Sequence, residues 1–188
     1  MTQDSASNHD YTPWDQWRAK DYLDEYYNEV MPDEQFALEF LQDSLERLPE
    51  VDVALDYGCG PTVHHSVALI NKVGEIHLAD YLEDNLEAIR SWVHCAADAH
   101  DWTPFTGYIL QLQGNADPSV EAIASAEDLT RQKIAHTWQS DAGDTDPLGP
   151  KMREFYPLVT THYCAEGATN DKETWALYMR NICSLVRP

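Results

Sequence analysis

The chain has 188 residues, of which 33 are acidic and 12 are Lys or Arg, so its formal net charge is −21. This length is typical of one domain, and 43% hydrophobic residues are enough to build a sizeable core. So negative a charge disfavours nucleic acid and anionic membrane surfaces as partners, because both are bound through Lys and Arg side chains.

The chain is predicted to begin with a flexible tail over residues 1–16, followed by one domain over residues 17–188. The first ten residues are polar and have the pattern of neither a signal peptide nor a transit peptide. The four cysteines form no Cys-x-x-Cys pair, which suits reduced thiols. No run of the sequence approaches the length of a membrane span, so we expect a protein of the cytoplasm.

Two helices are predicted next. Aromatic residues are dense from Tyr11 to Tyr27, and the i, i+4 spacing of Tyr22 and Tyr26 indicates a helix that packs on the core or forms a lid. A second helix, over residues 33–48, carries an apolar stripe that we expect to pack inward. This stripe consists of Phe36, Phe40, Leu41, Leu45 and Leu48.

Strands and helices alternate from residue 51 onward, which predicts an α/β fold with a parallel sheet flanked by helices. Strands are expected over residues 51–57, 75–79, 106–112, 133–139 and 155–163. Helices are expected over residues 63–71, 85–95, 117–131 and 171–185. The sequence contains no internal repeat and indicates no second domain.

A glycine turn follows the first of these strands, within Asp56-Tyr-Gly-Cys-Gly-Pro-Thr62. Gly58 and Gly60 allow the backbone to turn sharply and to approach a ligand closely. Asp80 closes the next strand, about 20 residues further on, where a carboxylate can accept hydrogen bonds from both hydroxyls of a ribose. The two segments therefore predict a nucleoside-binding site at the strand ends.

Two residues of the turn narrow the choice of cofactor. Val63 stands where the dinucleotide fingerprint has its third glycine, and Pro61 removes one backbone donor. Both features disfavour a bound pyrophosphate, and therefore the cofactors NAD and FAD. An NAD-dependent oxidoreductase is disfavoured for the same reason. They suit S-adenosylmethionine, which has no pyrophosphate.

Three successive motifs resemble those of the nicotinamide, phenylethanolamine and thioether methyltransferase family, class I enzymes that use S-adenosylmethionine. These motifs are Asp56-Tyr-Gly-Cys-Gly-Pro-Thr62, Ala79-Asp-Tyr-Leu-Glu-Asp-Asn-Leu86 and Asp101-Trp102. Asp21-Tyr-Leu-Asp-Glu-Tyr-Tyr27 is similar to the family's cofactor-covering segment. The resemblance implies a Rossmann-like sheet with an N-terminal helical lid, and methyl transfer to a small-molecule amine or ring nitrogen.

The resemblance also implies the residues of the site. Tyr22 and Glu166 would act in catalysis, where Glu166 would orient or deprotonate an amine. The cofactor would be bound at its methionine end by two tyrosines, at its ribose by Asp80 and Asn85, and at its adenine by Asp141. The full implied set for the cofactor is Tyr22, Tyr27, Gly58, Gly60, Thr62, His64, Asp80, Tyr81, Asn85, Asp141, Ala142 and Thr161.

Alternatives remain for two of these residues. His64 could be a partly exposed helix histidine, and Glu166 could be an exposed loop acid in a very acidic protein. The histidines of the chain have no recognised metal spacing, so the sequence predicts no metal site.

The end of the chain carries a further expectation. The family continues after this point with Gly-Gly and two more strands, so the sheet is expected to be shortened by these two strands. An unpaired sheet edge invites association, which allows a monomer or an edge-mediated dimer. The alternative function is accordingly a non-catalytic or vestigial S-adenosylmethionine-binding domain.

Overall fold

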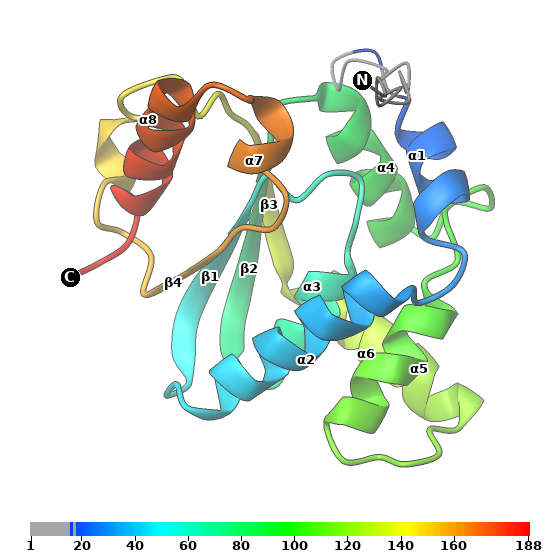
Figure 1. The fold of residues 1–188 in the computed structure, drawn as a ribbon. Coiled ribbons are helices and arrows are strands. Elements are labelled where there is room, and N and C mark those ends of the chain that lie inside the picture. Colours follow the sequence, from blue (N-terminus) through cyan, green and yellow to red (C-terminus); the bar gives the residue numbers. More distant parts are fainter. Residues whose placement is uncertain (1–15, 17) are drawn as a thin grey trace, which may run out of the picture.

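The computed structural model describes residue 16 and residues 18–188 (Figure 1). The tail predicted over residues 1–16 therefore lies outside the described residues except for Gln16, and so do Tyr11, Trp14 and Trp17 of the aromatic segment. At the centre of the described chain is a parallel sheet with the strand order β3-β2-β1-β4. Its strands are β1 (Val51–Tyr57), β2 (Val73–Asp80), β3 (Ile134–Gln139) and β4 (Leu158–Thr160).

The strand order creates a switch point beside β1. The chain runs from β1 to β2 and β3 on one side and then returns to β4 on the other side of β1. Tyr57 lies opposite Ala79 and Asp56 lies opposite Thr160, so the strands end at the same edge of the sheet. In open α/β sheets, ligands bind beyond the carboxyl ends of the strands at such a point.

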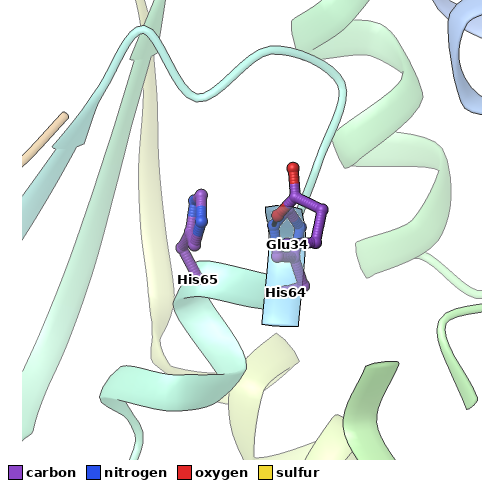
Figure 2. Close-up of side chains that lie close together, drawn as sticks. All are labelled: Glu34, His64 and His65. Atoms are coloured by element: carbon purple, nitrogen blue, oxygen red, sulfur yellow. Dashed lines mark hydrogen bonds and ion pairs between the residues drawn. The ribbon is translucent and has the colours of Figure 1, made fainter. Parts of the chain in front are cut away.

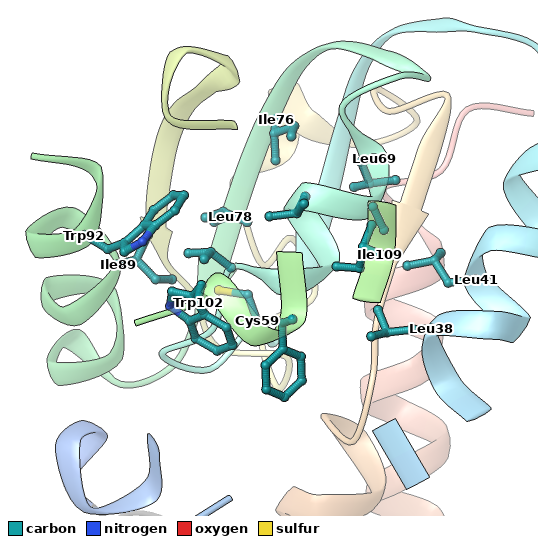
Figure 3. Close-up of a cluster of buried hydrophobic side chains, with 14 of the residues drawn as sticks. Leu38, Leu41, Cys59, Leu69, Ile76, Leu78, Ile89, Trp92, Trp102 and Ile109 are labelled. Carbon is teal, nitrogen blue, oxygen red and sulfur yellow. The ribbon is translucent and has the colours of Figure 1, made fainter. Parts of the chain in front are cut away.

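Helices cover both faces of this sheet, which confirms the predicted α/β class (Figure 1). The larger core lies on the face of Ala54, Ile76 and Leu78, and Figure 3 shows many of its side chains. The helices α2 to α6 cover this face, whereas α8 packs on the opposite face with Leu55 and Tyr57. The helices are α1 (Ala19–Tyr26), α2 (Pro32–Glu46), α3 (His64–Leu69), α4 (Glu83–Val93), α5 (Thr103–Leu112), α6 (Val120–Lys133), η2 (Pro150–Met152), α7 (Ala165–Ala168) and α8 (Lys172–Cys183).

The strand predicted over residues 106–112 is wrong, because this segment belongs to helix α5. Pro104 lies in the first turn of the helix, where its missing N–H removes no hydrogen bond. Phe105 and Ile109 are spaced as i, i+4 and are both buried in the core. A short apolar run does not by itself separate a buried strand from a buried helix, and here the spacing is helical. The other predicted strands are present, although the last is reduced to residues 158–160.

The packing stripe predicted on α2 is partly wrong. Leu41 and Leu45 are buried as expected, but Phe36 and Phe40 are 73% and 66% exposed. The buried positions of the helix are instead Glu34, Leu38, Leu41 and Leu45, which follow a 4-3-4 spacing. Glu34 takes the first of these positions because its carboxylate has hydrogen-bonding partners inside the protein. Leu48, also expected in the stripe, lies beyond the helix and is 42% exposed.

Phe36→Ser should therefore change the free energy of unfolding by less than about 0.5 kcal/mol, because the side chain lies in solvent. Urea denaturation followed by tryptophan fluorescence measures this change. Leu38→Ser on the same helix is the matched control, since Leu38 is 1% exposed and its loss should destabilise the domain clearly. A large loss of stability in the Phe36 variant would show that the phenylalanine is covered.

Candidate functional site

A cavity of about 720 Å³ lies at the carboxyl edge of the sheet. Its size is typical of a small-molecule site. The walls come from the turn after β1, the end of β2, the loop after β3 and the segment from residue 162 to residue 168. Tyrosines of the α1 segment and the first turn of α2 close the remaining side. Segments that are far apart in sequence thus meet beside β1, at the switch point where the strand order predicts a ligand.

The glycine turn forms the floor between β1 and β2. Gly58 and Gly60 have φ values of 71° and 60°, in the left-handed region that glycine adopts without strain. The Gly58 N–H donates to the carbonyl of Ala79 at 2.7 Å, which holds the turn against β2. A Cβ atom on Gly58 would lie 2.2 Å from the sulfur of Cys164, so the turn also touches the loop after β4.

Asp80 joins the two sequence motifs directly. Its Oδ2 accepts from the Gly60 N–H at 2.9 Å, and its Oδ1 accepts from the Leu82 N–H at 2.9 Å and from Asn85 Nδ2 at 2.8 Å. Burial raises the pKa of this carboxyl, although the three donors act in the opposite direction. Asp80 is 8% exposed and lines the cavity. The strand-end acid therefore has a fixed orientation at the centre of the site.

The far end of the cavity is formed after β3. Asp141 Oδ1 accepts from the Gly143 N–H at 2.7 Å, and the carbonyl of Ala142 accepts from Asn181 Nδ2 at 2.8 Å. Beneath them, the hydroxyl oxygens of Tyr57 and Ser140 lie 2.7 Å apart. These contacts attach the loop to α8 and to the sheet, so Asp141 is held at the cavity wall.

A chain of polar contacts runs along the opposite wall and ends at His64 behind it. The hydroxyl oxygens of Tyr22 and Tyr27 lie 3.3 Å apart, and Tyr27 donates to Glu34 Oε1 at 3.3 Å. His64 Nε2 lies 3.2 Å from Glu34 Oε2 (Figure 2). Burial raises the pKa of the Tyr27 hydroxyl. Burial also acts to raise the pKa of Glu34, but the contacts with His64 and Tyr27 outweigh it and leave that pKa lowered.

The cavity brings together eleven of the thirteen residues in the predicted site. They are Tyr22, Tyr27, Gly58, Gly60, Thr62, Asp80, Tyr81, Asn85, Asp141, Ala142 and Glu166. Tyr22 belongs to α1, whose buried residues Ala19 and Leu23 pack into the protein. The α1 segment therefore packs on the core through Ala19 and Leu23, whereas Tyr22 and Tyr26, the pair singled out in the sequence, line the cavity.

His64 and Thr161 are not among the lining residues. His64 is fully buried and stacks on Trp102, with ring centroids 5.3 Å apart, so it is not a partly exposed histidine either. The next residue, His65, reaches the cavity in its place. Successive residues of a helix point in different directions, and the start of α3 directs the first histidine to the core.

Several lining residues were missed by sequence reasoning. They include Asp33, Glu34, His65, His162, Tyr163 and Cys164. The residues after β4 could have been found, because a segment that follows a parallel strand lies at the carboxyl edge of the sheet. Nothing in the sequence marks Asp33 and Glu34, which reach the site through the packing of α2. Burial lowers the pKa values of His65 and His162.

The cysteines of the site should be unreactive. Burial raises the pKa of Cys164 to about 12 and raises that of Cys59 well above the ordinary value. Cys95 and Cys183 are exposed. We expect iodoacetamide at pH 8 to alkylate Cys95 and Cys183 and to spare Cys59 and Cys164, because the thiolate is the nucleophile and the raised pKa values of the latter two keep them protonated. Peptide mass spectrometry gives the extent at each site, with the unfolded protein as the control. Rapid alkylation of Cys164 would contradict the prediction.

Among the described residues, none of the helices combines the length and the hydrophobicity that a membrane crossing requires.

Comparison with known proteins supports the resemblance that the motifs indicated. The chain is 27% identical to nicotinamide N-methyltransferase of Homo sapiens over 180 residues, which cover 92% of this chain and 66% of that one. It is 29% identical to indolethylamine N-methyltransferase of Oryctolagus cuniculus over 177 residues, covering 90% and 65%. It is 24% identical to phenylethanolamine N-methyltransferase of Macaca mulatta over 136 residues, covering 71% and 47%.

The chain thus spans about two thirds of the length of the nicotinamide and indolethylamine enzymes that it matches. A sequence model of the NNMT/PNMT/TEMT family matches residues 5–188, which is nearly the whole chain. This chain therefore belongs to the NNMT/PNMT/TEMT family.

Proposed function

We propose that this chain binds S-adenosylmethionine in the cavity and transfers its methyl group to a small-molecule amine or ring nitrogen. The observation that carries the proposal is the meeting of the glycine turn, Asp80 and Asp141 around one cavity at the switch point of the sheet. The names of the relatives support the reaction, since all three are small-molecule N-methyltransferases.

The residues of the cavity fit this cofactor. The carboxylate of Asp80 lines the cavity in an orientation fixed by the donors described above, and a ribose hydroxyl would donate to it from the cavity side. Asp141 Oδ1 accepts from Gly143, so its other oxygen would accept from the adenine amino group. Tyr22 and Tyr27 would hold the methionine end. The absence of side chains at Gly58 and Gly60 would let the ligand lie against the backbone.

The bound cofactor would supply an electrophilic methyl group, and the chain would supply alignment. Methyl transfer is a direct displacement, so fixing the acceptor in line with the methyl carbon is the main catalytic contribution. Asp33, Glu34 and Glu166 line the cavity. Three carboxylates around one opening would attract a cationic amine, and Glu166 would orient it or accept its proton.

Isothermal titration with S-adenosylmethionine tests the proposal first, and NADH is the control ligand. A product assay by mass spectrometry over a panel of amines and pyridines follows. Binding with turnover supports the proposed function. Binding without turnover would favour the non-catalytic alternative, and no binding would contradict both.

A further inference from the structure

Three polar residues from separate segments meet beside the cavity and take no part in the cofactor contacts proposed above. Asp56 lies near the end of β1, His65 lies in α3, and His162 follows β4. One possible ligand atom from each lies within 4.8 Å of the others. The sequence predicted no metal site because no spacing was recognised, but the sheet topology brings these distant residues together.

The cluster is notable for its unpaired atoms. Asp56 Oδ2, His65 Nε2 and His162 Nδ1 are buried without a hydrogen-bond partner, and they are half of such side-chain atoms in the described part of the chain. Asp56 is 2% exposed and His65 is 6% exposed. A buried polar atom left without a partner destabilises the fold, so such atoms are rare in native proteins. Each residue of this cluster therefore carries one buried polar atom that a shared ligand could satisfy.

The contacts inside the cluster do not satisfy these atoms. Thr160 Oγ1 donates to Asp56 Oδ1 at 2.9 Å, so the second carboxylate oxygen is left facing His65. His65 Nδ1 lies 3.8 Å from that oxygen, which is too far for a hydrogen bond. The rings of His65 and His162 are stacked with centroids 3.8 Å apart, an arrangement that forms no hydrogen bond between them.

We propose that Asp56, His65 and His162 bind one divalent first-row transition metal ion, such as Zn²⁺. Two imidazole nitrogens and one carboxylate oxygen are a common ligand set for such ions. His65 and His162 line the cavity, so the ion can be reached from it and can keep open coordination positions toward it. Tetrahedral ligands about 2.1 Å from zinc lie roughly 3.4 Å apart, so binding would draw the side chains together and tilt the stacked rings.

Two other clusters of the described residues are less suitable. In the group of Glu34, His64 and His65, both carboxylate oxygens of Glu34 already have partners. In the group of Glu75, His77 and His136, both ring nitrogens of His77 have partners, namely Tyr156 and Glu75. Only the cluster at Asp56 offers an unpaired atom on every member.

Titration of the chain with Co²⁺, without added cofactor or methyl acceptor, tests this inference. We expect one ion per chain and a visible absorption band of nitrogen- and oxygen-ligated cobalt, which Zn²⁺ should displace. His162→Ala should weaken Co²⁺ binding by at least about 10-fold. Asp56→Asn should do the same, and circular dichroism checks that each variant is folded.

His136→Ala is the matched control, because it removes a histidine from a different cluster and should leave Co²⁺ binding unchanged. No stoichiometric binding would overturn the inference. Binding that survives His162→Ala in the folded variant would overturn it too, since this result means weak association with the acidic surface. The Co²⁺ titration requires no methyl transfer. A negative result would therefore remove the metal site and leave the proposed methyltransferase function untouched.

Discussion

Gly58→Ala should lower the free energy of unfolding by about 2–5 kcal/mol. The φ of 71° places any L-residue in the left-handed region, which costs about 1–2 kcal/mol. The new Cβ would also lie 2.2 Å from Cys164 Sγ and 2.4 Å from Cys164 Cβ, and such overpacking costs about 1–3 kcal/mol more. Urea denaturation followed by tryptophan fluorescence measures the total.

Two further variants separate the conformational cost from the overlap. Gly60→Ala has a similar φ of 60°, but its nearest neighbour would be Thr62 Cγ2 at 4.0 Å, so it should lose only the conformational part. Adding Cys164→Gly to Gly58→Ala removes both overlapping atoms and should recover part of the stability. Equal losses in the two single variants would show that the glycine turn does not contact the loop after β4.

The fold was largely predictable because its signals are local. Strands and helices alternate along the chain, and acids stand at or just after the ends of β2 and β3, so the order of the elements indicates a parallel sheet with its site at the carboxyl edge. The errors arose where burial depends on tertiary packing. The segment from Phe105 to Leu112 is apolar enough for either a strand or a helix, and Phe36 faces solvent because Glu34 and Leu38 define the inner side of α2.

Only the part of the cavity that lies next to the ends of β2 and β3 was predictable from the sequence. Asp80 ends β2 and Asp141 follows β3, so their positions could be inferred from the order of the elements. The opposite wall is assembled by packing between α2, α3 and the segment after β4, and no sequence spacing encodes this arrangement. Hence His65 and His162 were missed, and His64 was expected in the place that its neighbour occupies.

Asp80→Ala should weaken the binding of S-adenosylmethionine by about 1–3 kcal/mol, measured by isothermal titration. The substitution removes the proposed ribose acceptor. It also frees the N–H groups of Gly60 and Leu82, which the carboxylate now holds, so the turn loses part of its fixed shape. Both effects act in the same direction on affinity.

Two other variants distinguish these effects from a general change in charge. Asp98→Ala removes the same charge at an exposed position and should leave affinity unchanged. Asn85→Ala keeps the carboxylate and removes one of its three donors, so its effect should be smaller than that of Asp80→Ala. If Asp80→Ala is folded and binds as tightly as the unchanged chain, Asp80 does not contact the cofactor, and the cavity must hold the ribose elsewhere. If Asn85→Ala is the more damaging of the two, the amide is the main ribose ligand and the carboxylate serves to orient it.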